Sequence, residues 1–204
     1  MNERLIVFTR APELGQCKKR LASTIGDEAA LEAHRDLATA LLKRVQAFPG
    51  AKEICATHMT AEIERWASDF GFELSLQVQG DLGSRMFAAL EKAVFNGAER
   101  TVLIGTDCPD IDLRYVLDAF SVLHESELVL GPAEDGGYGL IGLTRPHAEL
   151  FKGIQWGSDQ VVQQTLSQAK QKDLNVGLLR EIWDVDTELD WQRYLASSAS
   201  RGIG

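Results

Sequence analysis

Short apolar runs rich in branched residues alternate along the chain with longer amphipathic stretches. Seven such runs predict strands, at residues 5–9, 53–58, 74–78, 101–105, 127–131, 139–143 and 175–179. Apolar runs without polar alternation are typical of strands covered on both faces by helices, as in a parallel sheet. The pattern therefore predicts an α/β protein built on a largely parallel sheet.

Apolar residues also recur at helical spacing between several of these strands. This spacing predicts helices over residues 30–45, 82–93, 113–123 and 161–169, and a further helix is expected after residue 186. Asp81 precedes the second of them, where it would cap the helix N-terminus. Because the alternation spans the 204 residues without a linker, we expect a single domain with a frayed tail after about residue 196.

Charge and cysteine content narrow the partners and the setting. The 21 Lys and Arg residues against 30 Asp and Glu give a net charge of −9, which opposes nucleic-acid binding over most of the surface. The three cysteines are widely spaced and odd in number, which favours a reduced protein over a disulfide framework. No apolar run is long enough to span a membrane, and no basic leader precedes the first strand. We expect a cytoplasmic protein.

A basic loop follows the first predicted strand, at the end of the sheet where parallel α/β proteins bind ligands. The candidate nucleotide-binding residues of this loop are Thr9, Arg10, Gly15, Lys18, Lys19 and Arg20. Gly15 would let backbone N–H groups approach a diphosphate, while the cations would bind phosphoryl oxygens. A solvated basic loop explains the same composition equally well. The loop has neither the Walker nor the dinucleotide-binding spacing.

Carboxylates follow two other predicted elements. Asp107 comes directly after the fourth strand, next to Thr106, which is a further candidate nucleotide-binding residue, and Asp184 and Asp186 stand before the last predicted helix. Mg²⁺ and Mn²⁺ are commonly held by one or two carboxylates together with phosphate oxygens and water. We predict a metal site at Asp107 and Asp186, with Asp184 as the substitute for Asp186. Helix capping is the alternative, with Asp186 or Thr187 at the N-terminus of the last helix.

The turns after the third and fifth strands carry further candidates. Glu134 and Asp135 precede a glycine pair, which a hairpin turn explains, yet either carboxylate could act as a general base. Gly80, Asp81 and Arg85 could surround a nucleobase, although helix capping by Asp81 is a sufficient explanation. The tryptophans at 156 and 183 could stack on a base or sugar, but core packing is their commoner role.

Five ordered segments together resemble one family, the bacterial and archaeal glycosyltransferase-like proteins described as radical-SAM/selenodomain-associated transferases. The segments are Phe8-Thr-Arg-Ala-Pro with Gly15 and Lys18-Lys-Arg-Leu21, Gly80-Asp-Leu-Gly-Ser-Arg-Met86, Leu103-Ile-Gly-Thr-Asp-Cys-Pro109, Leu130-Gly-Pro-Ala-Glu-Asp-Gly-Gly-Tyr138 and Asp184-Val-Asp-Thr187. The resemblance covers about residues 5–191. Leu14 and Lys19 depart from it, since the family usually has proline and threonine there.

This family is similar to nucleotide-diphosphosugar transferases of the GT-A type and to guanylyltransferases acting on molybdopterin or phospholactate. The resemblance implies a Rossmann-like three-layer α/β/α fold with a mostly parallel mixed sheet, and a nucleotide bound over the first loop. We expect a metal-dependent transferase that uses a nucleoside diphosphate sugar and a small acceptor. Lys18 and Arg20 would stabilise the leaving group, and Glu134 or Asp135 would act as base. The alternatives are nucleotidyl transfer and a non-catalytic nucleotide-binding domain.

Overall fold

In the computed structural model, which describes residues 2–200, seven strands form one mixed sheet of order β3-β2-β1-β4-β6-β5-β7. The strands are β1 (Glu3–Thr9), β2 (Ala51–Ala56), β3 (Glu73–Leu76), β4 (Arg100–Gly105), β5 (Leu128–Pro132), β6 (Tyr138–Leu143) and β7 (Val176–Leu178). All seven expected strands are present, and each bound lies within two residues of its expected place. The α/β class and the Rossmann-like mixed sheet are confirmed.

The sheet is parallel except at β6, which runs antiparallel to both of its neighbours, β4 and β5. The five residues 133–137 join β5 to β6, and so short a connection permits only an antiparallel pairing. β1, next to the central strand β4, pairs in parallel with β2 and with β4. The loops after β1 and β4 therefore leave the same edge of the sheet side by side.

The helices are α1 (Lys19–Ile25), α2 (Asp27–Val45), α3 (Ala61–Phe70), α4 (Leu82–Phe95), α5 (Leu113–Val122), α6 (Val161–Gln171) and α7 (Glu188–Ser200), with a short 3-10 turn η1 (Ala148–Phe151). α1, α3 and η1 were not expected. α1 buries only Leu21 fully, too few residues to produce a clear helical period. In α3, by contrast, Ile63, Trp66 and Ala67 are buried and Phe70 packs beside them, so the helical spacing is present and could have predicted this helix. α7 continues to Ser200, beyond the residue 196 from which the tail is expected to fray. Residues 201–204 lie outside the described residues.

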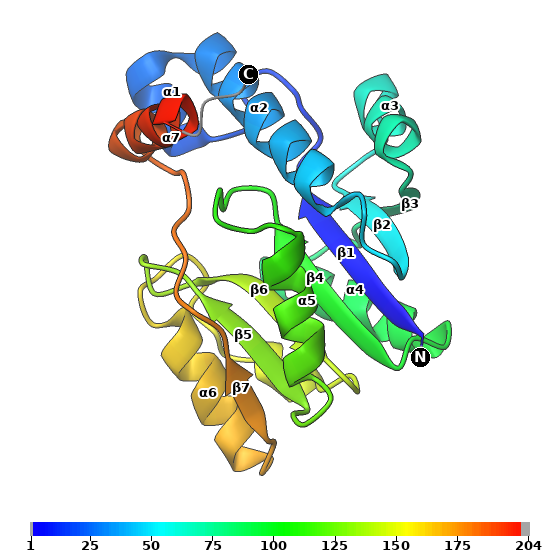
Figure 1. Cartoon of the computed structure of the whole chain (residues 1–204). Helices are drawn as coiled ribbons and strands as arrows, with labels where there is room; N and C mark the ends of the chain where they lie inside the picture. Colours follow the sequence, from blue (N-terminus) through cyan, green and yellow to red (C-terminus); the bar gives the residue numbers. More distant parts are fainter. Residues whose placement is uncertain (1, 201–204) are drawn as a thin grey trace.

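The helices form layers on the two faces of the sheet, and alternate strand residues supply each core. Leu5 and Val7 of β1 pack with residues of α2, α3 and α5, whereas Ile6 and Phe8 pack with residues of α4, α6 and η1. Figure 1 shows α2 and α5 on the near face and α4 behind the sheet. None of the helices in the described part of the chain is both long and apolar enough to cross a membrane. All three cysteines are buried and free, as expected.

The segment between β7 and α7 crosses the carboxyl ends of the central strands. It pairs with the end of β5 through a parallel bridge between Ala133 and Ile182. The Val185 N–H then donates a hydrogen bond to the Asp107 carbonyl oxygen (2.9 Å). In Figure 1 this orange segment runs up from β7 to α7, which lies beside α1. The C-terminal acids are thereby carried to the edge where the β1 and β4 loops emerge.

Candidate active site

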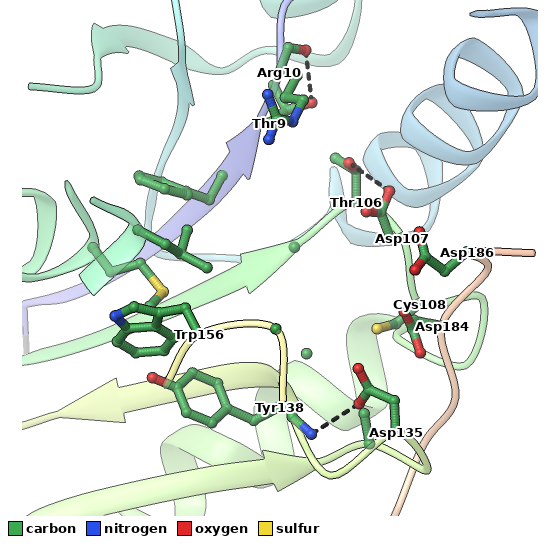
Figure 2. A pocket seen from close by; sticks show the side chains of 18 of the residues that line it. Thr9, Arg10, Thr106, Asp107, Cys108, Asp135, Tyr138, Trp156, Asp184 and Asp186 are labelled. Carbon is green, nitrogen blue, oxygen red and sulfur yellow. Dashed lines mark hydrogen bonds between the residues drawn. The ribbon is translucent and has the colours of Figure 1, made fainter. Parts of the chain in front are cut away.

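A cleft of about 500 Å³ opens at the carboxyl ends of the strands. Its walls come from the loops after β1 and β4, the first turns of α4, the β5–β6 hairpin, residues 156–158 and residues 184–186. These segments are far apart in sequence, and the parallel pairing of the central strands places their loops at one edge. Figure 2 shows Thr9 and Arg10 at one end, a column of carboxylates at a second, and Trp156 and Tyr138 at a third.

The cleft is richer in positive charge than the rest of the chain. Among the described residues that line it, five are cationic and four are acidic: Arg10, Lys18, Lys19, Arg20 and Arg85, with Asp107, Asp135, Asp184 and Asp186. The whole chain carries 21 cations against 30 acids. A local excess of cations within an acidic protein favours a phosphorylated ligand at this place.

Lys18 does not project freely into the cleft, as the prediction of direct phosphate contact assumed. Its side chain is only 4% exposed, and its Nζ lies 2.7 Å from Asp107 Oδ1. The same Nζ donates a hydrogen bond to the Val185 carbonyl oxygen (2.5 Å). Lys18 also has a left-handed backbone (φ 49°) just before α1, which turns its side chain inward. The ammonium group therefore joins three loops and neutralises Asp107.

Asp107 remains available to a ligand, because 48% of its side chain is exposed. Desolvation favours the neutral acid, but the positive charge of Lys18, with a smaller contribution from Arg10, holds the pKa of Asp107 below its ordinary value. The carboxylate is therefore ionised at neutral pH. Thr106 lies at the cleft wall beside it.

The C-terminal acids lie on either side of the anchored Val185. Asp186 Oδ2 accepts a hydrogen bond from Arg20 (2.7 Å). Asp184 is half-buried, and desolvation together with the nearby Asp135 and Asp107 carboxylates raises its pKa to about 6. Figure 2 shows Asp186 beside Asp107, with Asp184 between Asp186 and Asp135. Negative charge thus accumulates along one wall beyond what Lys18 and Arg20 neutralise.

Of the two residues proposed to cap α7, Thr187 does so, since its Oγ1 accepts a hydrogen bond from the Asp190 N–H (3.4 Å), and Asp186 does not. Thr187 precedes α7, and its backbone N–H and hydroxyl both bond the Asp190 carboxylate (2.8 and 2.7 Å). Asp112 caps α5 by accepting from the Tyr115 N–H (2.8 Å). Asp186 instead faces the cleft, where the prediction of a metal ligand requires it.

The structure separates the two candidate bases. Glu134 forms a bidentate ion pair with Arg193 (2.8 and 3.0 Å) and lines a neighbouring cavity rather than the main cleft. That hydrogen bond lowers the pKa of Glu134, which makes it a weaker base. Asp135 lines the cleft, and its Oδ1 accepts from the Gly137 N–H (2.8 Å) within the hairpin. Asp135 is the better placed of the two.

Three predicted nucleotide-binding residues lie outside the lining of the cleft. Asp81 accepts a hydrogen bond from the Ser84 N–H (2.8 Å) and caps α4, as the alternative explanation required. Gly80, in the turn before α4, has φ 134°, and Gly15 has φ 72°. Both glycines allow backbone conformations that other residues rarely adopt. These three residues shape the two loops, whereas Arg85 reaches the cleft itself.

Two residues that line the cleft were missed. His34 is buried, and its Nε2 lies 3.1 Å from the Arg10 carbonyl oxygen. Burial lowers the pKa of His34, so the ring is neutral and supports the β1 loop. The Gln77 amide nitrogen donates to the Thr9 and Cys55 carbonyls (both 3.0 Å), and its oxygen accepts from Arg85 (2.9 Å). Gln77 follows the third strand and could have been proposed, whereas His34 stands among core residues of α2.

The two candidate tryptophans have different environments. Trp183 is 6% exposed and packs with Leu37 and Val185, with the Arg193 guanidinium 4.1 Å from its ring centre. Core packing therefore accounts for Trp183. Trp156 is partly buried and lines the cleft, so it is available for ligand contact.

The metal prediction concerns Asp107 and Asp186. No group of three or more His, Cys, Asp or Glu side chains in residues 2–200 is arranged to hold a metal ion by itself. Two neighbouring carboxylates still match the ligand set of a hard divalent cation that takes its other ligands from phosphate and water. The donors present fit such a cation only when a phosphorylated ligand completes the shell.

Comparison with known proteins places the chain in a family. Residues 14–158 match the model of DUF2064, described as an uncharacterized protein conserved in bacteria. The chain belongs to the DUF2064 family. A crystal structure from Desulfovibrio desulfuricans G20, described provisionally as a nucleotide-diphospho-sugar transferase, is 32% identical, with a TM-score of 0.87 over 97% of this chain and 88% of that one.

More distant structures share the fold of this DUF2064 protein. 4-Diphosphocytidyl-2C-methyl-D-erythritol synthase from Anaerococcus prevotii has 9% identity and a TM-score of 0.66, covering 97% of this chain and 96% of that one. Glucosyl-3-phosphoglycerate synthase from Mycobacterium tuberculosis, in complex with Mn²⁺ and UDP, has 11% identity and a TM-score of 0.56, covering 95% and 76%. No curated protein matches the chain. The structural neighbours are thus sugar transferases and nucleotidyltransferases.

Proposed function

We propose that this DUF2064 protein is a metal-dependent transferase that moves a sugar from a nucleoside diphosphate to a small acceptor. The observation that carries the proposal is the meeting of Lys18 with Asp107 in a cleft that also holds Arg10, Lys19 and Arg20. The described function of the Desulfovibrio relative supports the same donor class. The Mycobacterium enzyme of the same fold is in complex with Mn²⁺ and UDP, which supports the proposal of a metal and a nucleotide in this cleft.

The cations at the cleft would hold the diphosphate by charge-assisted hydrogen bonds. Arg10 and Lys19 supply charge from the β1 loop, and Arg20 supplies it from the side of Asp186. Lys18 acts differently, because its ion pair fixes Asp107 and its second hydrogen bond fixes the segment that carries Asp186. It is a positioning residue for the two carboxylates.

A divalent cation, Mg²⁺ or Mn²⁺, would be held by Asp107 and Asp186 and would supply neutralisation of charge on the leaving diphosphate. The protein alone offers no complete metal site in the described residues. Metal and nucleotide should therefore bind with strong mutual dependence, each raising the affinity of the other by the same factor.

In the transfer step, the acceptor hydroxyl oxygen forms a bond to the anomeric carbon, and the bond from that carbon to the diphosphate oxygen breaks. The nucleoside diphosphate leaves. If the configuration at the carbon inverts, Asp135 takes the hydroxyl proton. Asp135 is suited to this role because it lines the cleft and is oriented by the Gly137 N–H.

Calorimetric titration with UDP, GDP, CDP and ADP, with and without Mn²⁺, tests the proposal. Asp107→Asn should weaken Mn²⁺-dependent binding of the preferred nucleotide by about 100-fold, roughly 3 kcal/mol. Asp118→Asn, at a carboxylate that pairs with Arg114 on α5, is the matched control and should leave binding unchanged. Equal affinity in wild type and Asp107→Asn would reject the assignment.

Product analysis separates the two reactions that this fold supports. Wild-type protein incubated with a panel of sugar nucleotides should release the nucleoside diphosphate. Release of pyrophosphate from nucleoside triphosphates, without turnover of sugar nucleotides, would assign the cleft to nucleotidyl transfer. Nucleotide binding without release of either product across the acceptor panel would indicate a non-catalytic domain.

A further inference from the structure

One wall of the cleft is apolar and aromatic, and the proposed transfer chemistry does not use it. The hydrophobic side chains that line the cleft there include Phe8, Leu82, Met86, Leu103, Tyr138 and Trp156. Tyr138 and Trp156 pack against a core cluster that contains Phe8, Met86 and Leu103, so the wall is an extension of the core on the α4 face. In Figure 2 the rings of Trp156 and Tyr138 lie away from Asp107, Asp186 and Arg10.

The wall is rigidly built around Trp156. A Cβ atom placed on Gly83 would lie 2.6 Å from Trp156 Cζ2 and 2.9 Å from its Nε1, so the indole packs directly against the first turn of α4. Tyr138 meets the indole edge-on, with ring centres 6.2 Å apart and an interplanar angle of 86°. A glycine inside a helix costs about 1 kcal/mol relative to alanine. At position 83 only a glycine leaves room for the Trp156 ring to pack directly against the helix.

The apolar character of the wall decides what can bind there. A sugar ring would bring several hydroxyl groups, and each one buried without a partner costs roughly 1–3 kcal/mol. Among the six side chains, polar groups are present only on Trp156, which has a single indole N–H donor, and on Tyr138. Its hydroxyl is buried, and no hydrogen bond of normal geometry joins it to the nearby Thr165. A planar or alicyclic hydrocarbon group would instead gain about 25 cal/mol for each Å² that it removes from water.

The position of the wall indicates which substrate it serves. The nucleotide is expected beside Thr9, Arg10 and the other cations, at the opposite end of the cleft from Tyr138. Asp135, the base that an acceptor hydroxyl must reach, lies in the same β5–β6 hairpin that leads into Tyr138. A substrate that contacts Asp135 therefore extends toward Tyr138 and Trp156, whereas the nucleobase lies away from them.

We propose that Trp156, Tyr138 and Leu82 form an acceptor subsite for a small alcohol that carries an aromatic or alicyclic hydrocarbon group. The acceptor role of this subsite rests on the proposed function, since it assumes that a nucleotide donor binds at the other end of the cleft. The hydroxyl of the alcohol faces Asp135, and its hydrocarbon part packs on Trp156. The subsite thus selects for an apolar acceptor and against a free sugar.

Saturation-transfer NMR on the full chain tests the subsite without nucleotide. Benzyl alcohol is the probe, and methyl α-glucoside is the polar comparator. Wild type should bind benzyl alcohol at least tenfold more tightly than methyl α-glucoside, and Trp156→Ala should lose at least tenfold of that affinity. Phe95→Ala is the matched control, because Phe95 is 90% exposed and does not line the cleft. Leu82→Gln, at a residue already 38% exposed, tests the wall if Trp156→Ala fails to fold.

A second arm separates the subsite from a nucleobase site. Trp156→Ala should change the Mn²⁺-dependent affinity for the preferred nucleotide by less than twofold. A tenfold loss of nucleotide affinity would assign the wall to the base and overturn the acceptor subsite. Equal benzyl alcohol binding in wild type and both wall variants, or preference for the glucoside, would also overturn it. Failure of every nucleotide to bind wild type would reject the proposed function, while the benzyl alcohol arm would still decide whether the apolar site exists.

Discussion

Removing the negative charge of Asp184 should stabilise the metal-free protein. Desolvation and two neighbouring carboxylates raise the pKa of Asp184 from 3.8 to about 6. A shift of that size corresponds to roughly 3 kcal/mol, at about 1.36 kcal/mol per pKa unit. Because the group is only half-buried, solvent screening reduces the expected effect to about 1–2 kcal/mol. Asp184→Asn should raise the free energy of unfolding by that amount at pH 8.

The direction of the pKa shift determines how the stability difference between Asp184→Asn and wild type varies with pH. The folded-state pKa lies above the unfolded value, so the folded protein holds this proton more tightly. The resulting stability is fully present below pH 4 and is lost as the pH rises through about 6. The advantage of Asp184→Asn over wild type should therefore be greatest at pH 8, fall by about half at pH 5 and approach zero at pH 4.

Urea unfolding in EDTA at pH 4, 5 and 8 measures this difference, and EDTA removes any bound cation. Asp159→Asn is the control, because Asp159 is exposed and its carboxylate accepts from Gln160 (3.0 Å). This control should change stability by less than about 0.5 kcal/mol at every pH. An Asp184→Asn variant that is less stable than wild type at pH 8, or whose advantage is independent of pH, would refute the picture of crowded carboxylates.

Two further predictions concern the packing of the site. Lys18→Met should destabilise the fold by about 2–4 kcal/mol in urea, because it leaves Asp107 unpaired, and the double variant with Asp107→Asn should recover at least half of that loss. An additive double variant would contradict this. Gly139→Ala should cost about 1–3 kcal/mol in thermal unfolding, since its Cβ would lie 2.5 Å from Cys108 Sγ, whereas Gly105→Ala meets no atom within 4 Å and should be near neutral. Equal Tm values for the two variants would show that the structure around Gly139 and Cys108 can shift to accommodate the added methyl group.

The local sequence pattern was sufficient to predict the strands of the sheet, because strands buried on both faces appear as continuous apolar runs. It failed where an element buries little, as in α1, whose one fully buried residue is Leu21. It also gave the correct explanation for Asp81, whose side chain accepts from the Ser84 N–H at the start of α4. Capping needs only residues three positions apart, so it can be recognised without the tertiary structure.

The candidate site was predictable as a set of segments but not as a set of contacts. Chain order and buried strands were enough to expect the β1 loop, Asp107 and Asp186 at one edge of the sheet. The partner of Lys18 could not be deduced, because Asp107 lies 89 positions further along the chain and meets it only when β1 and β4 pair in register. The choice between Glu134 and Asp135 likewise depended on Arg193 of α7, which holds Glu134 outside the cleft.

The sequence by itself determined the α/β class, the strands, the principal helices and the basic and acidic loops, because those depend on periodicity and on the chemistry of single residues. Only the tertiary structure decided which charges neutralise each other, which tryptophan faces the cleft and where the apolar wall lies. These features arise from contacts between segments distant along the chain, and their energies depend on burial and distance, which spacing in the sequence does not specify.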